Sequence, residues 1–204
     1  SMTSGTPPRW QVLHDGLVLA LQSDEATGVD AGLGVFPTSY DCDVTEMVVA
    51  PVPTADAASI DEHLGDSEMN GNTPLTFALE QVLDDPGLVR VAPEEPASVV
   101  VIADGPDNCY IDCMDRCGMN LECMEQCESE IEPLAAAQLS TVASALLDEH
   151  QIQVFAVGLG PDVSETMMEA MAGPGGTGDP YVVDSVDTLR DALLDIFHRM
   201  EACE

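Results

Sequence analysis

The chain has 204 residues, of which 45% are hydrophobic, and this is typical of a folded domain rather than a disordered chain. Five arginines stand against 38 acidic residues, for a net charge of −33. That charge repels nucleic-acid phosphates and anionic lipids, and no run of about 18 apolar residues is present to form a membrane helix. We therefore expect no nucleic-acid partner and no membrane insertion, and we expect residues 1–204 to form one domain.

Helices and short strands alternate along the first half of the chain. The apolar spacing predicts helices over residues 9–22 and 57–64 and a third that begins at Thr73. Between them, residues 31–36 and 46–52 have the composition of strands. Two prolines in the second of these favour a place at the edge of a sheet.

The strongest predicted strand is Ala97–Ala103, because it is wholly apolar after Ser98. Such a strand is typical of a parallel sheet that is buried on both faces. After an insertion at residues 107–131, the alternation resumes, and the remaining expected elements are helix 134–150, strand 152–157, helix 164–172, strand 181–183 and helix 186–200. The order predicts a three-layer α/β/α fold with a mostly parallel sheet and one antiparallel edge strand.

The insertion is rich in cysteine, which makes export from the cytosol the favoured interpretation. Two CxxxC units, Cys113 with Cys117 and Cys123 with Cys127, each place both thiols on one side of a helix. Antiparallel helical turns would then form nested bridges, Cys117–Cys123 inside and Cys113–Cys127 outside. The alternative, one zinc ion on four thiolates, is less favoured because zinc sites usually use CxxC pairs. Cys203 remains as a free or intermolecular thiol.

Six stretches in chain order resemble the von Willebrand factor type A (vWA) domain of secreted bacterial proteins. They are Arg9-Trp10, GLGVFP, GNTPLTFALE, VVVIADGPDNC, VFAVGLG and MAGPGGTGDPYVVDSVDTLRDALLDI, and they extend over residues 8–200 apart from the insertion. The resemblance implies a divalent-cation site at the carboxyl ends of the strands, built from a DxSxS motif, a threonine and an aspartate. In this chain the threonine corresponds to Thr73 and the aspartate to Asp104.

The resemblance also implies what the site binds. Oxygen ligands of this kind suit Mg²⁺, Ca²⁺ or Mn²⁺ and leave room for an acidic side chain of a protein partner. Cys42 and Cys109 occupy places that carry a cysteine pair in related secreted domains, so a third bridge is expected there. Its position beside Asp104 would stiffen the loops of the site.

The first strand of the family and nearly all of DxSxS are absent from the sequence. Ser1-Met2 fits either the tail of a DxSGSM stretch, which makes Ser1 the last hydroxyl ligand, or a cloning remnant. The lost strand occupies the middle of the sheet in the family, and its removal would expose on the order of 10 kcal/mol of apolar burial. We therefore hypothesise that a separate peptide or a neighbouring molecule supplies it.

These observations favour a non-enzymatic extracellular or cell-surface binding module, either secreted or attached as a lipoprotein. The alternative is a structural or scaffold domain whose metal site is incomplete. A hydrolase or a chelatase accessory subunit is disfavoured, because no catalytic constellation is found and the four histidines lack ligand spacing. The cysteine hairpin is expected to project from the rim of the metal site, as a stapled insertion or as a contact surface.

Overall fold

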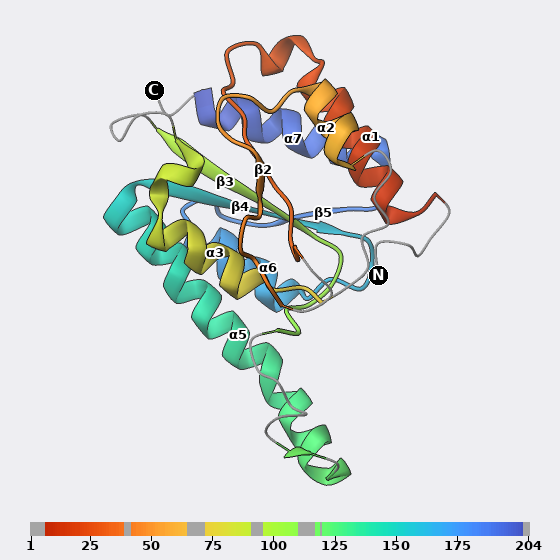
Figure 1. Cartoon of the computed structure of the whole chain (residues 1–204), viewed down its shortest axis with the longest axis vertical. Coiled ribbons are helices and arrows are strands. Elements are labelled where there is room, and N and C mark those ends of the chain that lie inside the picture. Colours follow the sequence, from red (N-terminus) through yellow and green to blue (C-terminus); the bar gives the residue numbers. More distant parts are fainter. Residues whose placement is uncertain are drawn as a thin grey trace.

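The computed structural model describes residues 7–38, 42–64, 72–90, 96–109, 117–118 and 120–201, in which helices cover both faces of a β-sheet (Figure 1). Ser1, Cys113 and Cys203 lie outside these residues. The helices are α1 (Arg9–Leu21), α2 (Ala57–Leu64), α3 (Leu75–Asp84), α5 (Leu121–His150), α6 (Glu165–Ala172) and α7 (Val186–Glu201), with 3₁₀ turns at Asp24–Ala26 and Pro86–Val89. The strands are β1 (Leu33–Gly34), β2 (Val48–Ala50), β3 (Ala97–Ala103), β4 (Ile152–Leu159) and β5 (Tyr181–Val183).

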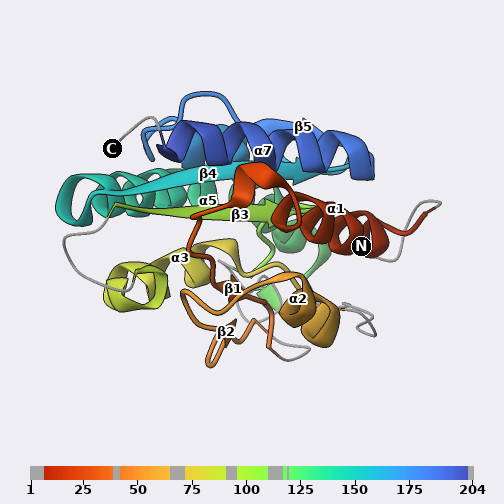
Figure 2. The same cartoon turned by 90° about the horizontal axis from the view of Figure 1, so that it is seen from above.

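The described strands form two sheets. β3, β4 and β5 are parallel neighbours in that order, and the β3–β4 register runs from Ala97 opposite Ile152 to Ala103 opposite Gly158. β1 and β2 form an antiparallel pair of their own. Among the described strands, β3 has β4 as its only neighbour. Figure 2 shows β1 and β2 beyond β3, on the side away from β4.

The two faces of the parallel sheet carry separate hydrophobic clusters, because side chains of a strand alternate between faces. Val154 and Ala156 of β4 join the cluster under α3, α5 and α6. Phe155 and Val157 join the cluster under α1 and α7. The expected three-layer α/β/α arrangement with a mostly parallel sheet is confirmed.

Three of the predicted elements match the structure at both ends. The expected bounds of β3, α2 and β5 are those observed, whereas β1 and β2 are much shorter than the predicted ranges 31–36 and 46–52. Prolines limit both segments, since Pro37 follows β1 and Pro51 follows β2. Among the strands that the structure describes, no other pairs with β1 or β2.

The largest difference concerns α5, which begins at Leu121 rather than at 134 and contains Pro133 inside the helix. Asn120 caps the new start, because its side chain accepts a hydrogen bond from the Cys123 amide at 3.1 Å. The insertion thus continues directly into the helix, whose first turns project away from the body (Figure 1). No described helix is long and apolar enough to cross a membrane.

Candidate functional site

Asp104 and Thr73 lie where the sequence predicts the cation site, at the carboxyl end of the parallel strands. Asp104 directly follows β3 and is 7% exposed, and Thr73 is half-buried two residues before α3. Both residues line one cavity of about 780 Å³. Their side chains offer a carboxylate and a hydroxyl, which are hard oxygen donors suited to Mg²⁺, Ca²⁺ or Mn²⁺.

A buried arginine occupies the same rim. Arg9, the first residue of α1, donates a hydrogen bond to the backbone carbonyl of Asp104 at 3.0 Å and lies 3.4 Å from its Oδ2. Its other terminal nitrogen pairs with the Asp162 carboxylate, and this hydrogen bond lowers the pKa of Asp162. Arg9 therefore joins the carboxyl ends of β3 and β4 and partly neutralises Asp104.

Arg9 requires a glycine beside it. A Cβ at Gly160 would lie 2.7 Å from Arg9 Nε, and Gly160 has a φ of +90°, which other residues rarely adopt. The sequence identified Arg9 only as the start of a helix. Its pairing with Asp104, 95 residues away, has no local signal.

The loop after β3 is hydrogen-bonded to the first turn of α3. The Asp107 carboxylate, 1% exposed, accepts hydrogen bonds from the Thr76 amide at 2.7 Å and the Cys109 amide at 2.9 Å. Asn108 Oδ1 accepts one from the Thr73 amide at 2.6 Å. These contacts fix Thr73 relative to the loop that carries Asp104. Sequence reasoning missed both Asp107 and Asn108, although an Asp-Asn pair just after a strand is typical of loops that bind backbone amides.

Two disulfides have both cysteines among the described residues, and both were predicted. Cys42, between β1 and β2, is bonded to Cys109, and Cys117 is bonded to Cys123 in the projecting hairpin. Cys127 is also disulfide-bonded, and its predicted partner Cys113 lies outside the described residues. The bridges leave these thiols unavailable for the zinc alternative. The Cys42–Cys109 bond ties the β1–β2 sheet to the rim of the parallel sheet.

The described residues alone do not complete a cation shell. Within the described part of the chain, no three His, Cys, Asp or Glu side chains converge as metal ligands. Ser1, the third predicted ligand, lies outside it. Asp104 and Thr73 fit a divalent cation in their chemistry, but such ions take about six to eight oxygens, so further ligands would have to be added.

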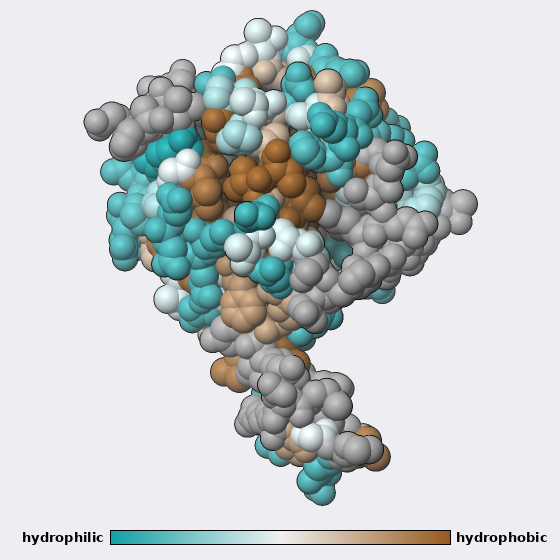
Figure 3. Space-filling model, in the orientation of Figure 1, coloured by the Kyte–Doolittle hydropathy of each residue, from teal (hydrophilic) through white to brown (hydrophobic). Residues whose placement is uncertain are grey.

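The cavity itself is mostly apolar and extends along β3. Residues from Ser98 to Asp104 form one wall, and Leu33, Gly34, Val48 and Ala50 of the β1–β2 sheet form part of another. In the space-filling view, an apolar area lies at the centre of this face between hydrophilic margins (Figure 3). The cavity therefore lies between β3 and the β1–β2 sheet.

Solved structures with related architecture were found, although no protein-family model and no curated protein matches the sequence. BatB from Bacteroides thetaiotaomicron superposes with a TM-score of 0.64 at 15% identity, covering 99% of this chain and 94% of BatB. A vWA protein from Catenulispora acidiphila superposes with a TM-score of 0.56 at 15% identity. The match covers 97% of this chain and 40% of the Catenulispora protein. Proximal thread matrix protein 1 from the mussel byssus was solved with a zinc-occupied MIDAS motif. It superposes with a TM-score of 0.57 at 16% identity, and the match covers 94% of this chain and 42% of the mussel protein.

This chain has a von Willebrand factor type A fold. It spans about two fifths of the mussel and Catenulispora proteins but nearly all of BatB. At these identities the likeness concerns the vWA fold alone.

Proposed function

We propose that this chain is a non-enzymatic extracellular or cell-surface adhesion module that binds a protein partner through a divalent cation. The proposal places the cation between Asp104 and Thr73 at the carboxyl rim, with Ser1 as a further hydroxyl ligand. Disulfides support an exported protein, secreted or lipid-anchored, since such bonds persist outside the cytosol. The observation that carries the proposal is that two oxygen donors, Asp104 and Thr73, line the same cavity in a vWA fold.

The physical basis is an incomplete coordination shell. A cation held by one carboxylate and hydroxyls keeps a net positive charge and open positions, so it gains from an acidic side chain of a partner. The mussel protein with a zinc-occupied MIDAS motif shows that a related fold holds a divalent ion.

Isothermal titration calorimetry with Mg²⁺, Ca²⁺ and Mn²⁺ tests the proposal on the full chain. Because the surface charge of −33 attracts cations everywhere, each titration needs a control variant of equal charge. Asp104→Ala should abolish one saturable site, whereas Asp187→Ala, at an exposed position on α7, should leave it unchanged. Thr73→Val, which removes only the hydroxyl, should weaken the site. Equal heats for wild type and Asp104→Ala would overturn the proposal.

That negative result would favour the second candidate, a structural or scaffold vWA domain with an incomplete metal site. The observation in its favour is the engagement of Asp104 by buried Arg9, which supplies a positive charge without any cation. Under this alternative Arg9→Ala should destabilise the fold and still yield no cation site in calorimetry.

A further inference from the structure

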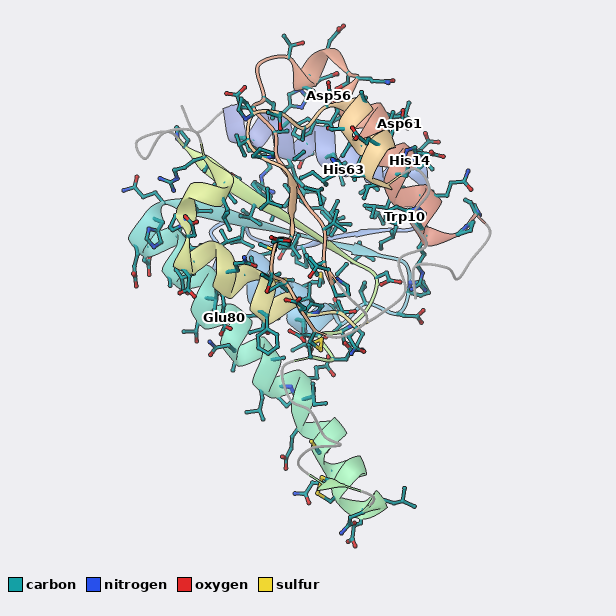
Figure 4. All side chains as sticks on the ribbon, in the orientation of Figure 1. Trp10, His14, Asp56, Asp61, His63 and Glu80 are labelled. Atoms are coloured by element: carbon teal, nitrogen blue, oxygen red, sulfur yellow. A yellow bond between two sulfur atoms is a disulfide. The ribbon has the colours of Figure 1, made fainter. Side chains whose placement is uncertain are left out.

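α2 is joined to α1 through a histidine that has a carboxylate at each ring nitrogen. His14 Nδ1 lies 2.8 Å from Asp15 Oδ1 on α1, and its Nε2 lies 2.8 Å from Asp61 Oδ1 on α2 (Figure 4). We propose that His14 is a pH switch for the docking of α2, which holds α2 against α1 when the imidazole is protonated and weakens that contact when it is neutral. The inference concerns the α1–α2 interface and involves neither Asp104 nor Thr73.

The arrangement around His14 calls for two protons on the ring. An ionised carboxylate only accepts hydrogen bonds, and a neutral imidazole has one N–H, whereas imidazolium has two. Both contacts are therefore hydrogen bonds only in the charged form, and in either neutral tautomer one ring lone pair faces a carboxylate oxygen. The pKa of His14 is raised in agreement with this, first by the hydrogen bond to Asp15 and further by Asp61, against the lowering effect of burial.

The Asp61 contact alone depends on the position of α2. Asp15 is next to His14 on α1 and stays beside it if α2 moves away. Loss of the His14 proton therefore weakens the docking of α2 only by the part of the pKa elevation that Asp61 contributes. The Asp61 side chain is 66% exposed, and an exposed ion pair changes an equilibrium by up to about fivefold. We expect the docking equilibrium to change by about threefold to fivefold.

α2 is an element that can respond to a change of this size. It has eight residues, a length at which an isolated helix is not stable in water, and α1 is the main element against which it packs. Its buried side chains Ile60 and Leu64 line the cavity and belong to neither hydrophobic cluster of the sheet. Local opening of α2 would thus uncover these two side chains and leave the parallel sheet in place.

α2 carries three ionisable residues in a row, and Asp61 is the one that is hydrogen-bonded to His14. Glu62 and His63 follow it, and successive residues of a helix turn by about 100°, so their side chains leave the helix on other sides. His63 nevertheless titrates in the same pH range as His14, and a protonated histidine in the last turn of a helix is itself stabilising. The test must therefore separate the two histidines.

The other elements packed against α1 are α7 and the first 3₁₀ turn, and their charged groups interact with one another. Arg190 of α7 pairs with Asp187 and Asp191, and the charge of Glu25 in the turn raises the pKa of the same arginine. α7 contributes apolar side chains to the cluster that it shares with α1. The acidic groups that raise the pKa of His14 are those of α1 and α2.

Hydrogen exchange on the full chain at about pH 5.5 and about pH 8.5 tests the switch, with each rate divided by the intrinsic rate at that pH. The α2 amides should lose about threefold to fivefold of their protection at the higher pH, whereas the α6 amides should not. The loss should equal ten raised to the difference between the His14 pKa of wild type and that of Asp61→Asn, both measured by NMR. Equal changes of protection in α2 and α6 would overturn the inference.

Three variants assign the effect to one histidine. His14→Lys keeps a positive charge beside Asp61 through this pH range and should make the protection of α2 independent of pH. His14→Gln should give the lower protection at both pH values. His63→Gln is the matched control, because it removes the other titrating group of α2 and should leave the pH dependence intact.

A pH dependence that vanishes in His63→Gln and persists in His14→Gln would refute the switch. If His14→Gln does not fold, Asp61→Asn decides, because its exposed position tolerates the change and the variant should also remove the dependence. A dependence that persists unchanged in Asp61→Asn would likewise overturn the inference.

Discussion

The Cys42–Cys109 disulfide should contribute more to stability than the Cys117–Cys123 disulfide, because it closes a much longer loop. The sequence separations are 67 and 6 residues. In the chain-entropy treatment, a loop of about 67 residues corresponds to about 4 kcal/mol of stabilisation and one of about 6 residues to about 2 kcal/mol. The location of each bond adds to this difference. Cys109 is 8% exposed and lies in the loop that follows β3, whereas the other bridge lies in the projecting hairpin.

The test compares two double variants. The first combines Cys42→Ala and Cys109→Ala, and the second combines Cys117→Ala and Cys123→Ala. Urea unfolding followed by far-ultraviolet circular dichroism should show a loss of unfolding free energy that is larger for the first by about 2 kcal/mol or more. Hydrogen exchange on the first variant should show faster exchange in β1 and β2, which pair with no other described strand. Equal losses, or a larger loss for the hairpin pair, would refute the reasoning.

Two further predictions concern buried and charged groups. Asp107→Ala should lower the unfolding free energy by about 3 kcal/mol in urea melts, since two amides lose a buried carboxylate acceptor, and Asp107→Asn should recover part of it. If Asp107→Ala lowered the unfolding free energy no more than the replacement of an exposed aspartate does, the capping role would be contradicted. The pKa of His14 is raised by its hydrogen bonds to Asp15 and Asp61, both 2.8 Å away. Its stabilising contribution should therefore be present below the unfolded-state pKa and be lost as pH rises through the raised value. Figure 4 shows His14 and Asp61 near each other, on α1 and α2. NMR titration should show a lower His14 pKa in Asp61→Asn, and an unchanged value would contradict this.

Local patterns in the sequence predicted the elements of this fold well. β3 was evident because its apolar run has no polar interruption after Ser98, and the inner hairpin bridge followed from cysteine spacing along a helix. The start of α5 could not be placed, because Pro133 usually marks a helix end, whereas Asn120 caps the helix 13 residues earlier. The fold class followed from the alternation of strands and helices.

The contacts that shape the rim were beyond sequence reasoning. Arg9 pairs with Asp104 across 95 residues, and Asp107 binds the Thr76 amide across 31. Pairs of this kind depend on where the ends of β3 and α3 meet in space, and neither residue type nor spacing encodes that meeting. Thr73 and Asp104 could be named only through the family resemblance. Asn108, which positions Thr73, was missed because a single asparagine in a loop is an ordinary turn residue.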